Sequence, residues 1–248
     1  MKIKRILVSQ PKPETDKNPY LEIAKKHNVT IDFRPFIKVE GVPAKEFRKD
    51  KINITEFSAV VFTSRNAVDN YFRICEEMRF TVPDTMKYFC ISEATAFYLQ
   101  KYVVYRKRKI FHGKQKFQDM IDVIKKHKQE KFLLPCSDIH KAEIPKLLTD
   151  NKIDFAKAVI YRTVACDLSD LNVTDFDMLV FFSPSGISSL QKNYPDFVQG
   201  DIQIGAFGPT TAKAVVDANL RLDVKAPMPQ VPSMSMALDQ HLKKANKK

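Results

Sequence analysis

Glycine is scarce in this chain, and the glycine-rich motifs that hold nucleotides are missing. Only 6 of the 248 residues are glycine, and no G-x-G-x-x-G turn, G-x-x-x-x-G-K-S/T loop or G-x-S-x-G elbow occurs. The 4 cysteines stand far apart without a C-x-x-C pair, and the 5 histidines show no metal-ligand spacing. These absences exclude the common nucleotide and serine-hydrolase motifs, and they indicate neither a zinc site nor a disulfide framework.

Long apolar runs are also missing. No stretch approaches the roughly 18 consecutive apolar residues of a membrane-spanning helix, and the first ten residues, "MKIKRILVSQ", are too short and too soon polar for a signal peptide. We therefore expect a soluble cytoplasmic protein that has no membrane partner.

Negative charge is in the minority, since the formal net charge is +12. The densest basic cluster is "YRKRK" at residues 105–109, which we interpret as a solvated strand edge. No helix-turn-helix, RNP or zinc-finger pattern accompanies it, so we expect no nucleic-acid partner. Nucleic-acid binding through residues 105–109 stays open as a weaker hypothesis, and an acidic small molecule is an equally good partner for the charge.

Segments with the pattern of buried strands alternate with segments of helical spacing along most of the chain. Strand-type runs such as "AVVF" at 59–62 and "DMLVFF" at 177–182 are each followed by an amphipathic helical pattern. The stripe formed by Phe117, Met120, Ile121 and Ile124 is interpreted as a helix face packed on the core. This alternation predicts an α/β fold with parallel sheets covered on both faces.

Three stretches recur in the same order at nearly constant spacing, which indicates two related α/β halves. "NVTIDF" at 28–33 matches "NKIDF" at 151–155, "FTSRNAV" at 62–68 matches "FSPSGIS" at 182–188, and "ISEATA" at 91–96 matches "GPTTA" at 208–212. In the first pair, Asn28 and Asn151 each follow an amphipathic helix, where we expect a left-handed residue to end it.

Hydroxyl residues follow several of the predicted strands, at the edge of a sheet where open α/β folds bind ligands. Ser183 is expected to cap a helix that has Pro184 at its first position, and Gly186 allows a close backbone approach. The other strand ends carry Thr63, Ser64, Ser92, Thr95, Gly208, Thr210 and Thr211. Capping alone explains any one of them, whereas the repetition indicates a cleft lined with helix starts that bind anions.

A candidate acid is Tyr161 in "AVIYRT", at the end of an extended segment that could face this cleft. The alternative is that it packs as an ordinary amphipathic strand residue.

The series "FTSRNAV", "VIYRT", "FFSPSGI" and "GPTTA" resembles, in that order, the motifs of the uroporphyrinogen-III synthase family over nearly the whole chain. The resemblance implies two flavodoxin-like parallel-sheet α/β domains joined by a two-stranded antiparallel ladder. One domain would comprise residues 1–36 with 164–248, the other 40–158, and the crossings would lie near 34–40 and 156–163.

The resemblance also implies a reaction that uses neither cofactor nor metal. Linear hydroxymethylbilane, a small-molecule polycarboxylate with eight carboxylates, loses water and closes with its last pyrrole ring inverted through a spiro intermediate. Tyr161 would assist the leaving hydroxyl. The substrate-binding residues would be Thr63, Ser64, Ser92, Thr95, Ser183, Ser185, Gly186, Thr210 and Thr211. The protein would act as a monomer in heme biosynthesis and receive substrate by transient hand-over from hydroxymethylbilane synthase.

Three positions depart from the family pattern. Gln10 stands where the family tends to have an arginine, Ser92 stands where glycine is common, and Cys136-Ser137-Asp138 replaces an Arg-Gly pair. These departures leave a second hypothesis, in which the chain is a non-catalytic relative that binds a tetrapyrrole or another polyanion.

Overall fold

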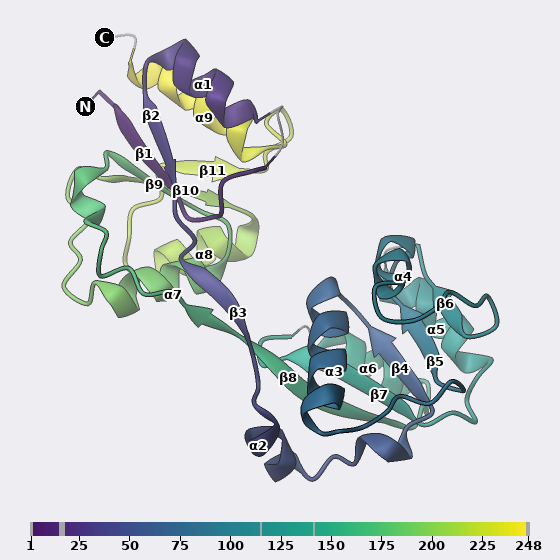
Figure 1. Cartoon of the computed structure of the whole chain (residues 1–248). Coiled ribbons are helices and arrows are strands. Elements are labelled where there is room, and N and C mark those ends of the chain that lie inside the picture. Colours follow the sequence, from purple (N-terminus) through teal and green to yellow (C-terminus); the bar gives the residue numbers. More distant parts are fainter. Residues whose placement is uncertain (1, 15–17, 115, 141, 247–248) are drawn as a thin grey trace. The chain divides into compact units, whose positions relative to one another are not determined.

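A computed structural model describes residues 2–14, 18–114, 116–140 and 142–246 (Figure 1). The chain divides into two compact units, which we call unit 1 (Met1–Lys38 with Val164–Lys248) and unit 2 (Val39–Thr163). Each unit contains a mainly parallel sheet with helices on its faces, so the predicted α/β class is confirmed. Among the described residues, no helix has the length and apolar character needed to cross a membrane.

Unit 1 is a three-layer sandwich around a five-stranded parallel sheet of order β11-β10-β9-β1-β2. Helices α1 and α9 cover one face and lie side by side (Figure 1), and α7 and α8 cover the other. The strands are β1 (Arg5–Val8), β2 (Thr30–Phe33), β9 (Met178–Phe181), β10 (Gln203–Phe207) and β11 (Val224–Ala226). The helices are α1 (Pro19–His27), α7 (Pro184–Asn193), α8 (Pro209–Asp217) and α9 (Met234–Ala245).

Unit 2 is built on a six-stranded sheet of order β3-β8-β7-β4-β5-β6. Helices α3 and α4 pack on one face, and α5 and α6 pack on the other. The strands are β3 (Ile37–Gly41), β4 (Ala59–Phe62), β5 (Lys87–Cys90), β6 (Ile110–His112), β7 (Phe132–Ser137) and β8 (Phe155–Ala165). The helices are α2 (Ala44–Phe47), α3 (Arg65–Glu77), α4 (Glu93–Leu99), α5 (Phe117–Lys125) and α6 (Glu143–Asp150).

The two parallel sheets share one strand order. In unit 1 the spatial order β2-β1-β9-β10-β11 is the flavodoxin-like order 2-1-3-4-5. In unit 2 the strands β8-β7-β4-β5-β6 occupy the positions of strands 2-1-3-4-5 in the same order. The difference is that the first of these strands along the chain, β4, takes the position of strand 3. The strand order therefore reverses between β1 and β9 in unit 1, and between β7 and β4 in unit 2. Open α/β sheets bind ligands at the carboxyl ends of the strands at such a topological switch point.

Strands β3 and β8 are neighbours in the six-stranded sheet. The Val42 N–H donates to the Ile160 carbonyl at 2.9 Å, and the Cys166 N–H donates to the Phe36 carbonyl at 2.9 Å. The residue numbers fall on one strand as they rise on the other, which is the pattern of antiparallel pairing. The crossings expected near 34–40 and 156–163 stay a prediction about how the units are linked.

Two local expectations are confirmed and one is wrong. Asn28 ends α1 with φ 51°, and the apolar stripe of α5 is buried against the sheet. Asn151 is not left-handed, because its φ is −93°, and the positive φ of 54° falls on Lys152 instead. Helix α6 thus ends at Asp150, directly before Asn151, but the left-handed residue follows one position later than expected. Helix α9 was not anticipated, although its buried Met234, Leu238 and Leu242 form an apolar face.

Candidate functional site

Three of the serines expected at strand ends are helix caps. Ser64 Oγ accepts from the Ala67 N–H at 3.1 Å, and Ser92 and Ser183 accept at 3.3 Å from the residue three places on. Each serine has extended backbone angles and satisfies an N–H that the first helical turn leaves unpaired. The caps are confirmed, and the binding of substrate carboxylates by these serines stays a prediction.

The threonines and glycines of the expected site are placed differently. Thr95 and Thr211 are only 5% and 1% exposed, and the Thr95 hydroxyl lies 3.2 Å from Ser92 Oγ. Thr210 is exposed on α8, whose start is capped by Gly208 at a φ of 91° that favours glycine. Buried hydroxyls of this kind reach a ligand less readily than the neighbouring backbone N–H groups.

Gly186 and Ser185 lie in the first turn of α7 in unit 1. A side chain at Gly186 would put its Cβ 3.2 Å from the Phe181 ring and 3.7 Å from Ser9 Oγ. Glycine therefore allows α7 to begin close to the ends of β9 and β1, which is the switch point of unit 1. Ser185 is half-buried one residue before it.

The switch point of unit 2 contains a pocket of about 220 Å³. It brings together three of the predicted site residues, because Thr63 and Ser64 follow β4 and Tyr161 comes from β8. The Tyr161 hydroxyl lies 3.3 Å from Ser64 Oγ, where either group can donate the hydrogen bond. Ser92 and Thr95 are not among the described residues that line this pocket. Besides Thr63, Ser64 and Tyr161, the lining includes Ile91, Leu134, Cys136, Ser137, Ile139, His140, Ile144 and Pro145.

A β-bulge places Tyr161 in this pocket. Along β7 and β8, Cys136 pairs with Val159, but the next residue, Ser137, pairs with Tyr161, so Ile160 is the extra residue. As a result Ile160 and Tyr161 are both buried in succession, where a regular strand would alternate. The bulge thus re-aims the tyrosine at the carboxyl edge of the sheet.

The Tyr161 phenol stays protonated at neutral pH. Burial raises its pKa above the ordinary value near 10, and the neighbouring Cys136 and Asp138 act in the same direction, against the hydrogen bond from Ser64. Its side chain is 8% exposed. A protonated phenol at a pocket wall can donate a hydrogen bond to an oxygen atom of a bound ligand.

The loop after β7 contributes residues that sequence reasoning missed as site candidates. Asp138 accepts hydrogen bonds from the Ser137 hydroxyl at 2.8 Å, the Ile139 N–H at 2.9 Å and the Thr163 N–H at 3.3 Å. Burial works to raise the pKa of Asp138, but these hydrogen bonds outweigh it and hold the pKa below its usual range. The position of "PCSD" at a strand end was the available signal.

A larger cavity of about 450 Å³ in unit 2 contains none of the predicted site residues. Its walls include Met86 and Tyr88 at the start of β5, and Ile110 at the start of β6. It therefore lies at the amino ends of the strands, away from the edge where open α/β sheets bind ligands. Arg106 and Lys109 of the basic cluster stand at this cavity.

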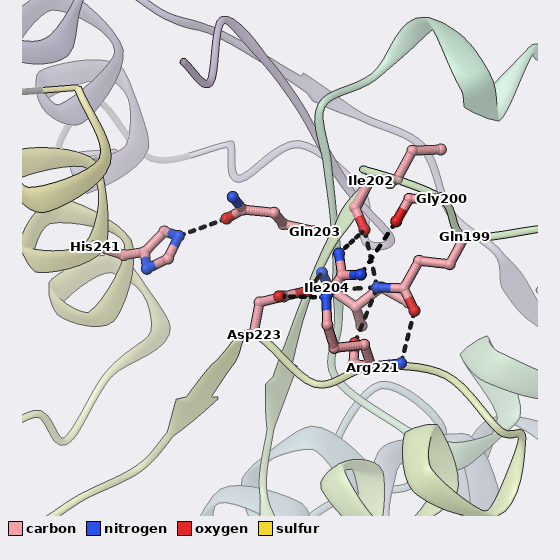
Figure 2. Close-up of polar contacts among 8 residues, drawn as sticks. All are labelled: Gln199, Gly200, Ile202, Gln203, Ile204, Arg221, Asp223 and His241. Carbon is pink, nitrogen blue, oxygen red and sulfur yellow. Dashed lines mark hydrogen bonds and ion pairs between the residues drawn. The ribbon is translucent and has the colours of Figure 1, made fainter. Parts of the chain in front are cut away.

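A dense polar cluster at the amino edge of the unit 1 sheet is structural (Figure 2). Arg221 donates to the Gly200 and Ile202 carbonyls and to Asp223, while the Gln199 amide bridges Ile202 and Arg221. These donors and acceptors form hydrogen bonds with one another, and the bonds connect the loop before β10 to the loop before β11. We assign no ligand to this cluster.

A family model and several solved structures match the chain. A family model described as uroporphyrinogen-III synthase HemD matches residues 18–235 of the chain. The solved structure of uroporphyrinogen-III synthetase from Helicobacter pylori 26695 is 17% identical, covers 98% of this chain and 100% of that chain, and has a TM-score of 0.58. A mutant uroporphyrinogen III synthase from the extremely thermophilic bacterium Thermus thermophilus is 13% identical, covers 98% and 99%, and has a TM-score of 0.53. No curated protein matches the chain significantly.

Proposed function

The chain belongs to the uroporphyrinogen-III synthase family, and on that premise we propose that it is itself a hydro-lyase that converts hydroxymethylbilane to uroporphyrinogen III. The linear tetrapyrrole loses water and closes to a macrocycle with its last pyrrole ring inverted. The observation that carries the proposal is the Tyr161 phenol, protonated and 3.3 Å from Ser64 Oγ, in a pocket at a topological switch point.

In the proposed mechanism Tyr161 assists departure of the substrate hydroxyl. The phenol donates its hydrogen bond to that oxygen, which leaves as water once it has been protonated, while the electron-rich pyrrole supplies the electrons that expel it. The methylene carbon that has lost the hydroxyl is attacked by a pyrrole carbon, which then releases its proton, so the phenol is restored and the net change is loss of one water. The protein's main task is to fold the chain so that the inverted ring closes, since unassisted closure gives the uninverted isomer.

We further propose that helix starts hold the carboxylates of the substrate. The caps Ser64, Ser92 and Ser183 mark helices whose free N–H groups and dipoles favour anions. Because Thr95 and Thr211 are buried, and the Thr95 N–H already donates to Ser92 Oγ, we expect these positions to contribute mainly through the unpaired N–H groups of the same first helical turns. The remaining members of this proposed set are Thr63, Ser185, Gly186 and Thr210.

The direct test supplies freshly made hydroxymethylbilane to the purified protein and determines the isomer ratio of the product after oxidation to porphyrins. We expect the inverted isomer to dominate with the native protein. Heat-denatured protein is the control, and it should yield the uninverted isomer of spontaneous closure. If the native protein also gave only the uninverted isomer, the proposed activity would be wrong.

The site of action and the partners are further parts of this proposal. We propose that the chain acts as a monomer in the cytoplasm and takes its substrate directly from hydroxymethylbilane synthase. Light scattering after size exclusion tests the first point, because a dimer would double the mass of 28.6 kDa. A coupled assay tests the second, because direct hand-over should keep the uninverted by-product low even when the two enzymes are dilute.

A further inference from the structure

A histidine and a lysine meet beside the Tyr161 pocket. His140, in the segment after β7, is half-buried and lines the pocket, and the exposed Lys157 lies on β8. The Lys157 Nζ atom is 3.5 Å from the His140 Nε2 atom. Lys157 pairs in register with Leu134, another residue of the pocket lining. Paired residues of neighbouring strands point to the same face, so Lys157 projects on the pocket side of the sheet.

The hydrogen bonds of His140 define its tautomer. Its Nδ1 atom lies 3.0 Å from the Ser137 carbonyl oxygen, and a carbonyl can only accept, so Nδ1 carries a proton and donates it. The Lys157 ammonium is only a donor, so Nε2 facing it must present a lone pair. In this arrangement the His140 ring bridges the Ser137 carbonyl and the Lys157 ammonium, which lies beside the pocket.

The ammonium of Lys157 keeps binding capacity. It has three N–H donors, of which His140 takes one. Among the described residues, no carboxylate forms an ion pair with Lys157. The acid of the neighbouring loop, Asp138, is occupied by the Ser137 hydroxyl and by two backbone N–H groups. The pocket lining thus has an apolar side, which includes Ile91 and Ile144, and through His140 it has beside it the Lys157 cation, which no described carboxylate neutralises.

We propose that Lys157, positioned by His140, binds a carboxylate of the substrate beside the Tyr161 pocket. The inference rests on the proposed function, in which each pyrrole ring of the substrate carries carboxylate arms. An apolar side suits a pyrrole ring, and an ammonium at the edge of the pocket suits one of its carboxylates. Lys157 is then a binding group, and His140 is a positioning residue that acts through it.

Steady-state kinetics of Lys157→Gln on hydroxymethylbilane test the binding role. We expect KM to rise about two- to fivefold, the range of exposed ion pairs, with kcat and the isomer ratio unchanged. Lys157→Arg should keep a KM close to the native one. The matched control is Lys126→Gln, which removes the same charge from an exposed lysine at the end of α5. If Lys157→Gln and Lys126→Gln gave the same KM, the proposal would be overturned.

A double-mutant cycle tests the positioning role. His140→Leu should raise KM in the native background but have no further effect when Lys157 is already glutamine, because the histidine acts only through the ammonium. Additive effects would show that His140 does not position Lys157. If His140 had only a structural role, His140→Leu would instead lower the midpoint of thermal unfolding equally in the native and the Lys157→Gln backgrounds.

Binding of uroporphyrin III, the oxidised and fluorescent form of the product, separates this proposal from the proposed function. Fluorescence titration needs no turnover, so it remains informative if the native protein fails to produce the inverted isomer. We expect Lys157→Gln to raise the Kd by the same two- to fivefold over Lys126→Gln. An equal Kd for the two variants, or no binding by the native protein, would count against a carboxylate site at Lys157.

Discussion

Replacing Tyr161 with phenylalanine removes one hydroxyl and should separate catalysis from stability. The hydrogen-bond partner of that hydroxyl is Ser64 Oγ, at the long distance of 3.3 Å. Such a bond contributes at most about 0.5–1.5 kcal/mol, and here we expect the lower end. Since about 1 kcal/mol shifts the midpoint of a domain this size by about 2–4 °C, Tyr161→Phe should unfold within about 2 °C of the native protein.

The effect on turnover should be larger. General acid assistance is typically worth about 10²–10⁴-fold, and we expect about 10²-fold because the pyrrole already helps expel the hydroxide. That factor corresponds to about 2.7 kcal/mol of transition-state stabilisation. The surviving product should remain the inverted isomer, because folding of the substrate, and not the phenol, selects the isomer.

Single-turnover assays with pure, freshly made hydroxymethylbilane provide the measurement. The control is Tyr194→Phe in unit 1, whose single O–H proton is shared between the Leu168 and Leu171 carbonyls, 2.8 and 2.6 Å from the oxygen. This variant loses a short hydrogen bond donated by a half-buried hydroxyl and should lower the unfolding midpoint, yet its rate per folded molecule should stay native. If Tyr161→Phe kept the full rate, the assigned role would be wrong and Tyr161 would be a packing residue.

Three further predictions concern other parts of the chain. Asp223→Ala should destabilise unit 1 by about 1–3 kcal/mol in urea unfolding, because the buried Ile204 N–H loses its acceptor at 2.8 Å. Asp223→Asn should destabilise the unit less, and equal losses of unfolding free energy in the two variants would contradict this reasoning. Burial lowers the pKa of His241 despite the opposing charge of Asp223, so its folded pKa lies below the unfolded value and stability should fall as pH drops through about 6.5. The His241 ring, which contacts the Gln203 side chain (Figure 2), is the group responsible, so the decline should be smaller in His241→Gln; an unchanged profile would contradict this. Reversing the exposed charges at residues 106–108 should leave KM within about twofold because salt screens charges beyond about 8–10 Å, and a large rise would favour the basic cluster as the anion site.

Local patterning was sufficient to predict most of the fold. Buried strands such as β4 and β9 are continuous apolar runs that end in a hydroxyl residue, and the helix after each begins with a serine cap. These signals are contained within a few residues. The expectation for Asn151 was wrong by one residue, because the left-handed residue that follows α6 is Lys152.

The site was only partly predictable, because its geometry depends on strand register. Tyr161 and Ser64 could be nominated from strand-end positions, but their 3.3 Å approach requires the extra residue Ile160 in β8. His140 and Lys157 meet because β7 and β8 are paired, and no local pattern records a contact across that distance in the sequence. The burial of Thr211 likewise depends on how α8 packs on its sheet.

The nearly constant spacing of the sequence repeat has a structural explanation in the strand orders. The first half of the chain supplies the parallel strands β1, β2, β4, β5 and β6, and the second half supplies β7 to β11. Within each half, these five strands correspond, in chain order, to strands 1 to 5 of the flavodoxin-like sheet. The units combine these halves differently, because β1 and β2 of the first half join β9 to β11, while β7 and β8 of the second half join β4 to β6. The two halves have thus exchanged their first two strands, as in an intramolecular domain swap. Each switch point therefore lies where strands from different halves meet, and Ser64 faces Tyr161 across that junction in unit 2.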